Sequence, residues 1–264
     1  MRAYLSLLKA ECSKVIGDIK TYWLDYIFGN VNIFFMFLGL FYSFSLNVAD
    51  ENEKILFLFG LMFWYYGSHA IDLVAILIEE EIQQGTLEQL LMSKTSLSMS
   101  LFFRIIAQLF FDTIKGVFVV VVCVLAFRIN FSSLVSVRFL LMLIIFFVGI
   151  IALYGIGYII AGLSLIYKNA TVIASISNNL LLFFSGAIIS IDKFPEIVQN
   201  VIKLFPIYWS NEIIEELLLY TSMNTILSSL LILIFQLIFW WVIGQVFVRR
   251  CLGYVYKKGT TASY

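Results

Sequence analysis

Six long apolar runs, separated by short polar segments, constrain the fold of this chain more than any other feature. They cover roughly residues 24–46, 55–78, 104–127, 139–165, 172–190 and 225–247. A helix needs about 20 mainly apolar residues to cross the hydrocarbon core of a bilayer. The chain is 62% hydrophobic and 13% charged, whereas soluble domains are about 45–50% apolar and about 25% charged. We therefore expect an all-α polytopic membrane protein with six transmembrane helices.

The segment before the first run is amphipathic and has no continuous apolar stretch of the kind found in signal peptides. Its apolar residues recur at helical spacing: Leu5, Leu8, Cys12, Val15 or Ile16, and Ile19. Its basic residues lie mostly off that stripe: Arg2, Lys9, Lys14 and Lys20. This pattern predicts a helix that lies on the membrane surface.

Lysine and arginine residues set the expected orientation. With six spans, both termini and the segments 79–103 and 166–171 share one side. Together with Arg104 at the boundary of the third run, this side holds 11 of these residues against five on the other side. Cytoplasmic loops carry the excess of positive charge, so both termini are expected in the cytoplasm. We therefore read residues 1–264 as a single transmembrane domain. Its parts are an interfacial helix (1–23), a six-span bundle (24–247) and a cytoplasmic tail (248–264).

The segment EEEIQQGTLEQLLMSK, residues 79–94, separates the second and third runs. Gly85 suits the left-handed residue that ends a helix. Thr86 has the side-chain oxygen of a helix cap, and Gln89 follows at the spacing of a capping box. Glu88 falls in the first turn, where the helix dipole favours negative charge. The short helix has an apolar face that must be buried against the bilayer or a partner, formed by Leu87, Leu90 and Leu91. An ordinary solvated connector is the alternative.

This segment resembles the "E…GTLE.LL.s" signature of type-2 ATP-binding-cassette (ABC) exporter permeases. In that family the loop between spans two and three forms a coupling helix, which sits in a cleft of the ATPase subunit. The resemblance implies ATPase-coupling roles for Glu81, Gly85, Thr86, Leu87, Glu88, Leu90 and Leu91. It also implies an ABC ATPase subunit and a second permease chain, in a homo- or heterodimer, as partners. The expected location is the plasma membrane of a prokaryote, in contact with lipid.

A second segment, residues 185–218, lies between the fifth and sixth runs. Pro195 suits the first turn of a short helix, Pro206 ends that helix, and Ser210 caps a second one. Helices this short cannot span, so they should be re-entrant or interfacial on the outer side. The segment resembles the family region "sG…P…lP", which forms a lid over the exit path, although the family often has proline where this chain has Ile189-Ser190-Ile191. The resemblance implies an extracellular gate containing Gly186, Pro195 and Pro206.

Charged residues also occur inside the apolar runs. The third run carries four polar residues at intervals of four, four and three, which places them on one helix face: Arg104, Gln108, Asp112 and Lys115. The second run carries His69 and Asp72. A charge at the bilayer centre costs about 2.5–3.5 kcal/mol, so these side chains must face protein or water. We expect a polar network in which Asp72 or Asp112 neutralises Lys115. Its role is structural, or in conformational switching, or in cargo contact.

The fifth run has a polar side with three candidate pathway residues, Ser175, Asn178 and Asn179. The resemblance places this span near the dimer interface and the translocation path. Small and polar residues also serve plain helix packing, which is the alternative.

Several activities are not expected. The chain has no GxxxxGK[ST] phosphate loop and no catalytic motif, so ATP and Mg are expected on the partner ATPase. It has zero net charge, which gives no case for nucleic-acid binding, and its three cysteines lack metal-ligand or redox spacing. An intramembrane aspartyl protease using Asp72 and Asp112 is disfavoured, because their surroundings lack the GxGD context of such enzymes.

The expected function is the permease subunit of an ATP-driven exporter. Its cargo is expected to be a hydrophobic or amphipathic drug, antimicrobial peptide or lipid. The alternatives are export of lipid-linked glycans and gradient-driven secondary transport.

Overall fold

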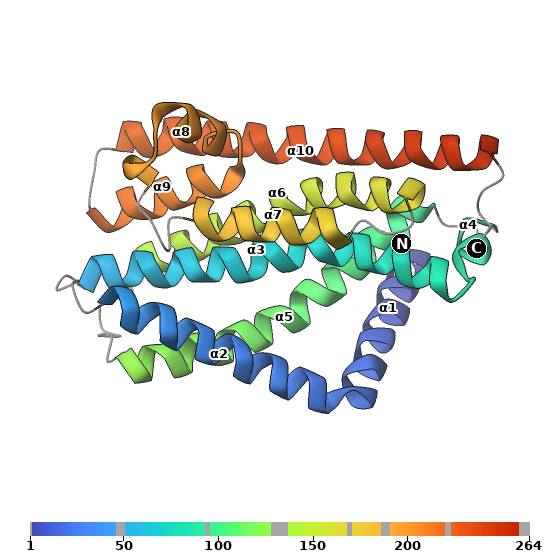
Figure 1. Cartoon of the computed structure of the whole chain (residues 1–264), viewed down its shortest axis with the longest axis horizontal. Coiled ribbons are helices and arrows are strands. Elements are labelled where there is room, and N and C mark those ends of the chain that lie inside the picture. The colour runs from blue at the N-terminus through green and yellow to red at the C-terminus, as the bar shows by residue number, and fades with distance from the viewer. Residues whose placement is uncertain are drawn as a thin grey trace. The chain divides into compact units, whose positions relative to one another are not determined.

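The computed structural model describes residues 2–45, 51–92, 96–127, 137–167, 171–185, 191–219 and 223–258. Within these ranges all regular elements are helical (Figure 1). The helices are α1 (Arg2–Thr21), α2 (Trp23–Ser45), α3 (Glu51–Gln83), α4 (Leu87–Met92), α5 (Leu97–Phe127), α6 (Val137–Tyr167), α7 (Thr171–Phe184), the 3-10 helix η2 (Ile191–Lys193), α8 (Glu196–Ile202), α9 (Pro206–Leu219) and α10 (Met223–Lys258).

Five of the described helices are long and apolar enough to cross a membrane, which confirms the prediction of an all-helical, multi-pass membrane protein. These segments are Trp23–Ser43, Glu51–Gln83, Leu97–Ala126, Val137–Tyr167 and Thr225–Lys257. The expected span 172–190 contains α7, which has 14 residues. At a rise of about 1.5 Å per residue such a helix is about 21 Å long, shorter than the hydrocarbon core of about 30 Å. Residues 186–190 lie outside the described residues, so a sixth span stays a prediction.

The chain divides into two compact units. Unit 1 comprises Met1–Leu46 and Glu88–Ile129, and unit 2 comprises Asn47–Leu87 and Asn130–Tyr264. The division falls within α4, so that Leu87 belongs to unit 2 and the rest of α4 to unit 1.

Unit 1 is built from α1, α2 and α5. Figure 1 shows α1 turning sharply away from α2 where the two helices join. One face of α1 packs on α5: the rings of Tyr4 and Phe103 stack at 6.2 Å, and Val15 is buried. Leu5 and Ile16, which belong to the predicted apolar stripe, stay exposed. The sequence thus predicts the helix, but part of its apolar stripe faces away from the rest of the chain.

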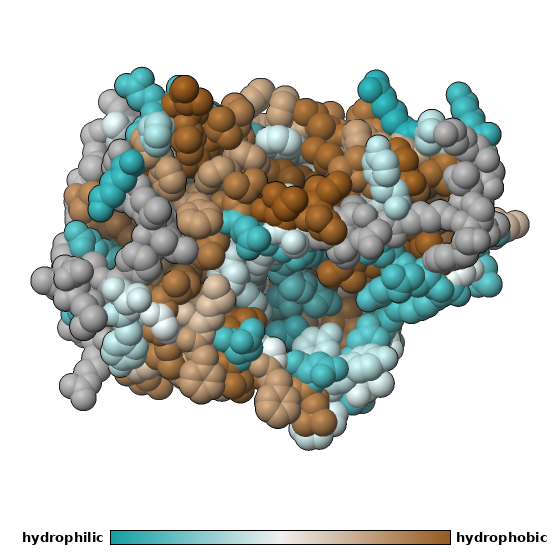
Figure 2. Space-filling model, in the orientation of Figure 1, coloured by the Kyte–Doolittle hydropathy of each residue, from teal (hydrophilic) through white to brown (hydrophobic). Residues whose placement is uncertain are grey.

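Unit 2 has its core where α3, α6 and α10 meet, and it depends on glycines. A Cβ atom on Gly155 of α6 would lie 2.6 Å from the Trp240 backbone carbon of α10. A Cβ atom on Gly157 would lie 2.5 Å from the Ala70 carbonyl oxygen of α3. The absence of side chains lets these backbones approach closely, as small residues do in membrane helix packing. On its outer side the middle of α10 is covered by hydrophobic residues, as a lipid-facing helix requires (Figure 2).

Candidate functional site

The turn between α3 and α4 is a Schellman motif. Gly85 has a φ of +68°, a conformation that glycine adopts without a Cβ penalty. The Gly85 N–H donates to the Ile82 carbonyl at 3.1 Å, and the Thr86 N–H donates to the Glu81 carbonyl at 3.0 Å. These two bonds satisfy carbonyl groups that the end of a helix leaves without partners. The prediction that Gly85 ends the helix in a left-handed conformation is confirmed.

The Thr86 hydroxyl closes this turn from the side of α3. It donates to the Glu81 carboxylate at 2.5 Å and approaches the Glu81 carbonyl at 3.4 Å. The predicted capping box with Gln89 is wrong, because no bond between Thr86 and Gln89 occurs among the described residues. A hydroxyl bonds more strongly to a carboxylate than to a neutral group. The Glu81 carboxylate lies within reach of Thr86 because the chain turns at Gly85, after α3 has ended.

The short helix α4 presents a mixed surface. Leu87 is buried, whereas Leu90 and Leu91 are only half-buried. Glu88 and Gln89 are exposed, and Met92 is 88% exposed. Two of the three leucines predicted to share one face therefore remain accessible to a partner, while the third anchors the helix in the chain.

The polar face of α5 is paired within unit 1. Arg104 lies 3.7 Å from a carboxylate oxygen of Glu11 on α1. Asp112, which is buried, accepts a 3.1 Å bond from the Lys115 ammonium and a 3.3 Å bond from the Gln108 amide. The four predicted residues thus do lie on one face. The structure contains the pairing of Lys115 with Asp112, and it forms between residues three apart on the same helix.

Asp72 of α3 has a different partner. The Asn178 amide of α7 donates a hydrogen bond to its carboxylate, and His69 precedes Asp72 by three residues on the same helix. Asp72 was expected to pair with the charges of α5 and Asn178 to line a pathway, so a contact between these two residues was not expected from the sequence. His69 and Asp72 belong to unit 2 and the α5 residues to unit 1. One network shared by both sets stays a prediction.

A buried contact that the sequence analysis missed joins α3 to α6. The Ser164 hydroxyl donates to the Glu79 carboxylate at 3.2 Å, and the two side chains are 0% and 7% exposed. Glu79 stands at the start of the EEE run, which on the sequence looks like the solvated end of a span. The only signal for the contact is a lone serine in the apolar sequence of α6.

The elements after α7 are held by side-chain bonds to backbone carbonyls. Pro195, predicted in the first turn of a helix, lies one residue earlier, as the N-cap of α8. The prediction that Pro206 ends this helix is wrong, because α8 ends at Ile202. Pro206 is the first residue of α9, where its missing N–H costs nothing. The predicted capping role of Ser210 is therefore wrong: Ser210 lies inside α9, and its hydroxyl donates to the Pro206 carbonyl. The Gln236 amide of α10 donates to the Lys203 carbonyl at 2.8 Å, which fixes the connection between α8 and α9.

A comparison of the chain with models of protein families identifies its family. The model of the family described as "ABC-2 type transporter" matches residues 2–219, well over half of the chain. The chain belongs to the ABC-2 type transporter family. Membership implies association with an ABC ATPase subunit. No curated protein matches the chain.

The remaining predicted residues of this ABC-2 permease lie on α7 or next to it. Ser175 and Asn179 are exposed on α7, whereas Asn178 between them is half-buried against Asp72. Gly186 lies outside the described residues, and the neighbouring Ser185 is buried. The Asn211 amide of α9 donates to the Ser185 carbonyl at 2.6 Å, which ties the end of α7 to α9.

Proposed function

We propose that the chain is the permease subunit of an ATP-driven exporter and that a separate ATPase subunit docks on α4. The observation that carries this proposal is the α3–α4 turn. Its conformation is fixed by Gly85 and by the Thr86–Glu81 bond, and α4 leaves Leu90, Leu91 and Glu88 accessible. An apolar helix face of this size matches the helix-in-groove mode of recognition.

In the proposed topology the chain crosses the plasma membrane six times, with both termini and α4 in the cytoplasm and α8 and α9 on the outer side. The 11-to-five bias of lysine and arginine supports this orientation. ATP and Mg bind to the ATPase, because this sequence has no phosphate loop. Ser175 and Asn179, which are exposed on an apolar helix, favour a second permease chain or a water-filled path beside α7.

The cargo in this proposal is hydrophobic or amphipathic. The membrane-spanning helices are largely apolar, and their polar groups are few and mostly paired, as in the Asp112–Lys115 and Asp72–Asn178 contacts. A strongly polar cargo would lose its hydrogen bonds to water in such a path and would find few protein groups to replace them, which costs free energy.

The proposal is tested by co-purification of the tagged chain with a co-expressed ABC ATPase. Leu90→Asp places a charge on the docking face, and we expect it to abolish capture of the ATPase. Leu219→Asp is the matched control, because Leu219 is an exposed leucine of α9, on the proposed outer side. We expect that variant to retain the ATPase. Equal capture by both variants would contradict docking on α4.

A further inference from the structure

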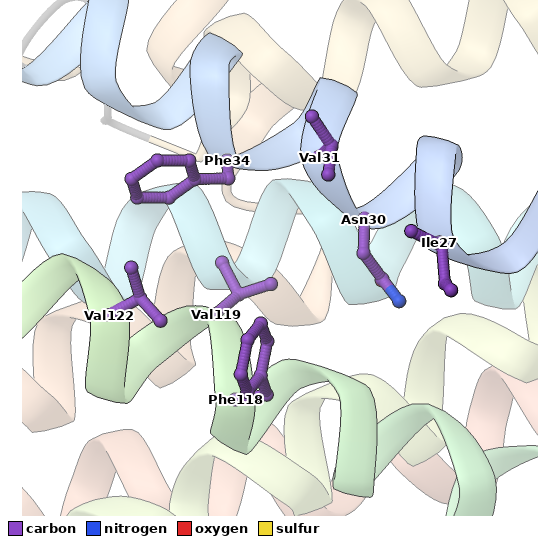
Figure 3. A pocket seen from close by; sticks show the side chains of 7 residues that line it. All are labelled: Ile27, Asn30, Val31, Phe34, Phe118, Val119 and Val122. Carbon is purple, nitrogen blue, oxygen red and sulfur yellow. The ribbon is translucent and has the colours of Figure 1, made fainter.

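A cavity lies between α2 and α5 within unit 1, and no residue of α4 lines it (Figure 3). Its volume is about 380 Å³, within the range of about 300–1,000 Å³ that is usual for sites of small molecules. Six of its seven lining residues are apolar: Ile27, Val31, Phe34, Phe118, Val119 and Val122. The seventh is Asn30. An occupant must therefore be apolar along most of its length.

Asn30 gives the cavity one polar position. Figure 3 shows its amide pointing from α2 into the space beside α5. No hydrogen bond to this amide is found in the described part of the chain. In hydrocarbon an amide without a partner is costly, since no water is available to replace one. The occupant is thus expected to supply a hydrogen-bond acceptor at the level of Asn30.

Charged groups mark one end of the cavity. Tyr26 precedes Asn30 by one helical turn, and the Lys115 ammonium lies 4.2 Å from the centre of the Tyr26 ring. Lys115 in turn precedes the lining residue Phe118 by three residues on α5. Its ammonium has three N–H donors, and the described contact with Asp112 uses one of them. This end of the cavity therefore still has donors for an anionic group.

Aromatic residues indicate the level in the bilayer at which the Lys115 end of the cavity lies. Tyr22, between α1 and α2, and Trp23, at the start of α2, are 57% and 55% exposed. Such residues favour the boundary between headgroups and acyl chains. Further along, the helices expose apolar rings such as those of Phe28 and Phe118. The cavity thus runs from the interface on the α1 side into the apolar layer.

We propose that this groove binds one acyl chain of a phospholipid from the surrounding bilayer. The chain lies along Phe34, Val119 and Val122, its ester carbonyl accepts a hydrogen bond from the Asn30 amide, and its phosphate lies toward Lys115. A phospholipid has these three groups in the same order: an anionic phosphate, an ester acceptor and an apolar chain. The proposal does not depend on ATPase docking and can be tested without the ATPase.

The first test is photolabelling of the purified full chain in lipid nanodiscs. The probe is a phosphatidylglycerol with a diazirine in the middle of one acyl chain, and labelled peptides are mapped by mass spectrometry. Labelling of residues 118–122 is divided by that of α10, which measures ordinary lipid contact. Val31→Trp fills the groove, and we expect this ratio to fall at least threefold. Val121→Trp is the control, because Val31 and Val121 are both 41% exposed and only Val31 lines the cavity.

An unchanged ratio in Val31→Trp would overturn the proposal, as would an equal fall in both tryptophan variants. Low labelling of residues 118–122 in the wild-type chain, together with an oxidant-induced disulfide between two copies of a Val31→Cys variant, would assign the groove to a protein interface instead. That outcome would also overturn the proposal.

The second test addresses the polar contact at Asn30. The melting temperature of the chain in detergent is measured with diester phosphatidylglycerol and with its diether analogue, which lacks the ester carbonyls. We expect the wild-type chain to gain more stability from the ester lipid, and Asn30→Leu to lose that preference. Because the readout is a difference between two lipids on one variant, it tolerates a lower starting stability. The same preference in both proteins would rule out the proposed hydrogen bond.

Discussion

Glu79 of α3 accepts a 3.2 Å hydrogen bond from Ser164 of α6, and both side chains are buried. From Glu79, α3 continues to the Schellman turn at Gly85, and α4 follows that turn. The contact therefore fixes the C-terminal end of α3 to α6 in the core of unit 2, seven residues before Thr86.

Removing the Ser164 hydroxyl should weaken the packing of α3 on α6. Ser164→Ala leaves a buried carboxylate oxygen without this donor, so we expect a loss of about 1–3 kcal/mol of stability, read as a lower melting temperature in detergent. Ser228→Ala is the control. The Ser228 hydroxyl is exposed and bonds only locally, to the Thr225 carbonyl, so we expect a change within about 0.5 kcal/mol. A Ser164→Ala protein as stable as wild type would show that the bond contributes little.

Gly85→Ala should disturb the turn between α3 and α4, because an L-residue with a side chain in the left-handed conformation costs about 1–2 kcal/mol. We expect weaker capture of the ATPase by Gly85→Ala and a smaller effect from Gly85→Asn, since asparagine tolerates this conformation better. Gly17→Ala is the matched control: Gly17 is helical, and nothing would contact a Cβ atom added there. We expect full capture by that variant. Full capture by Gly85→Ala would mean that docking does not need this turn.

The Lys115–Asp112 pair should behave as one unit. Lys115→Met leaves the buried Asp112 without its cation, and we expect a loss of about 3–5 kcal/mol, as for other broken buried pairs. Exchanging the charges, with Asp112→Lys and Lys115→Asp in one chain, should restore part of that loss. The melting temperatures of wild type, the two single variants and the double variant are compared in a double-mutant cycle. Additive losses in the double variant would show that the two charges do not interact.

Glu216 gives α9 a dependence on pH. Burial raises the pKa of this carboxyl above its ordinary value of 4.5, and the negative charge of Glu212 raises it further. A raised pKa in the folded state means that the folded state binds a proton more tightly than the unfolded state. Its stabilising contribution is complete below pH 4.5 and is lost as the pH rises through the folded-state pKa. We therefore expect Glu216→Gln to be more stable than wild type at neutral pH.

The measurement for Glu216→Gln is the melting temperature in detergent from pH 4 upward. The advantage of the variant should shrink toward acidic pH, where wild-type Glu216 is also neutral. A constant difference between variant and wild type across this range would exclude titration of Glu216 as the cause.

Features that depend on one helix could be read from the sequence. The apolar runs predicted the long helices, because length and hydrophobicity are properties of a single segment. Gly85 was predicted to be left-handed from its position after a helical pattern. The spacing from Arg104 to Lys115 predicted a shared face, which follows from helical periodicity alone.

Features that depend on which helices become neighbours could not be read in the same way. The contacts of Asp72 with Asn178 and of Glu79 with Ser164 each join residues more than 80 positions apart. The sequence contains several polar residues that could be the partner of Asp72 or of Glu79, and it does not show which of them becomes a neighbour in the fold. Local competition explains the other errors. Thr86 had a carboxylate in reach as well as a helix to cap, and Pro206 suits the start of a helix as well as the position after one.

The contact of Gly155 with α10 has a mechanical consequence. Main chain meets main chain there, with no side chain between α6 and α10 that could change rotamer and let the helices slide. This crossing is therefore suited to act as a fixed pivot. Conformational changes of unit 2 are accordingly expected to move α6 and α10 together.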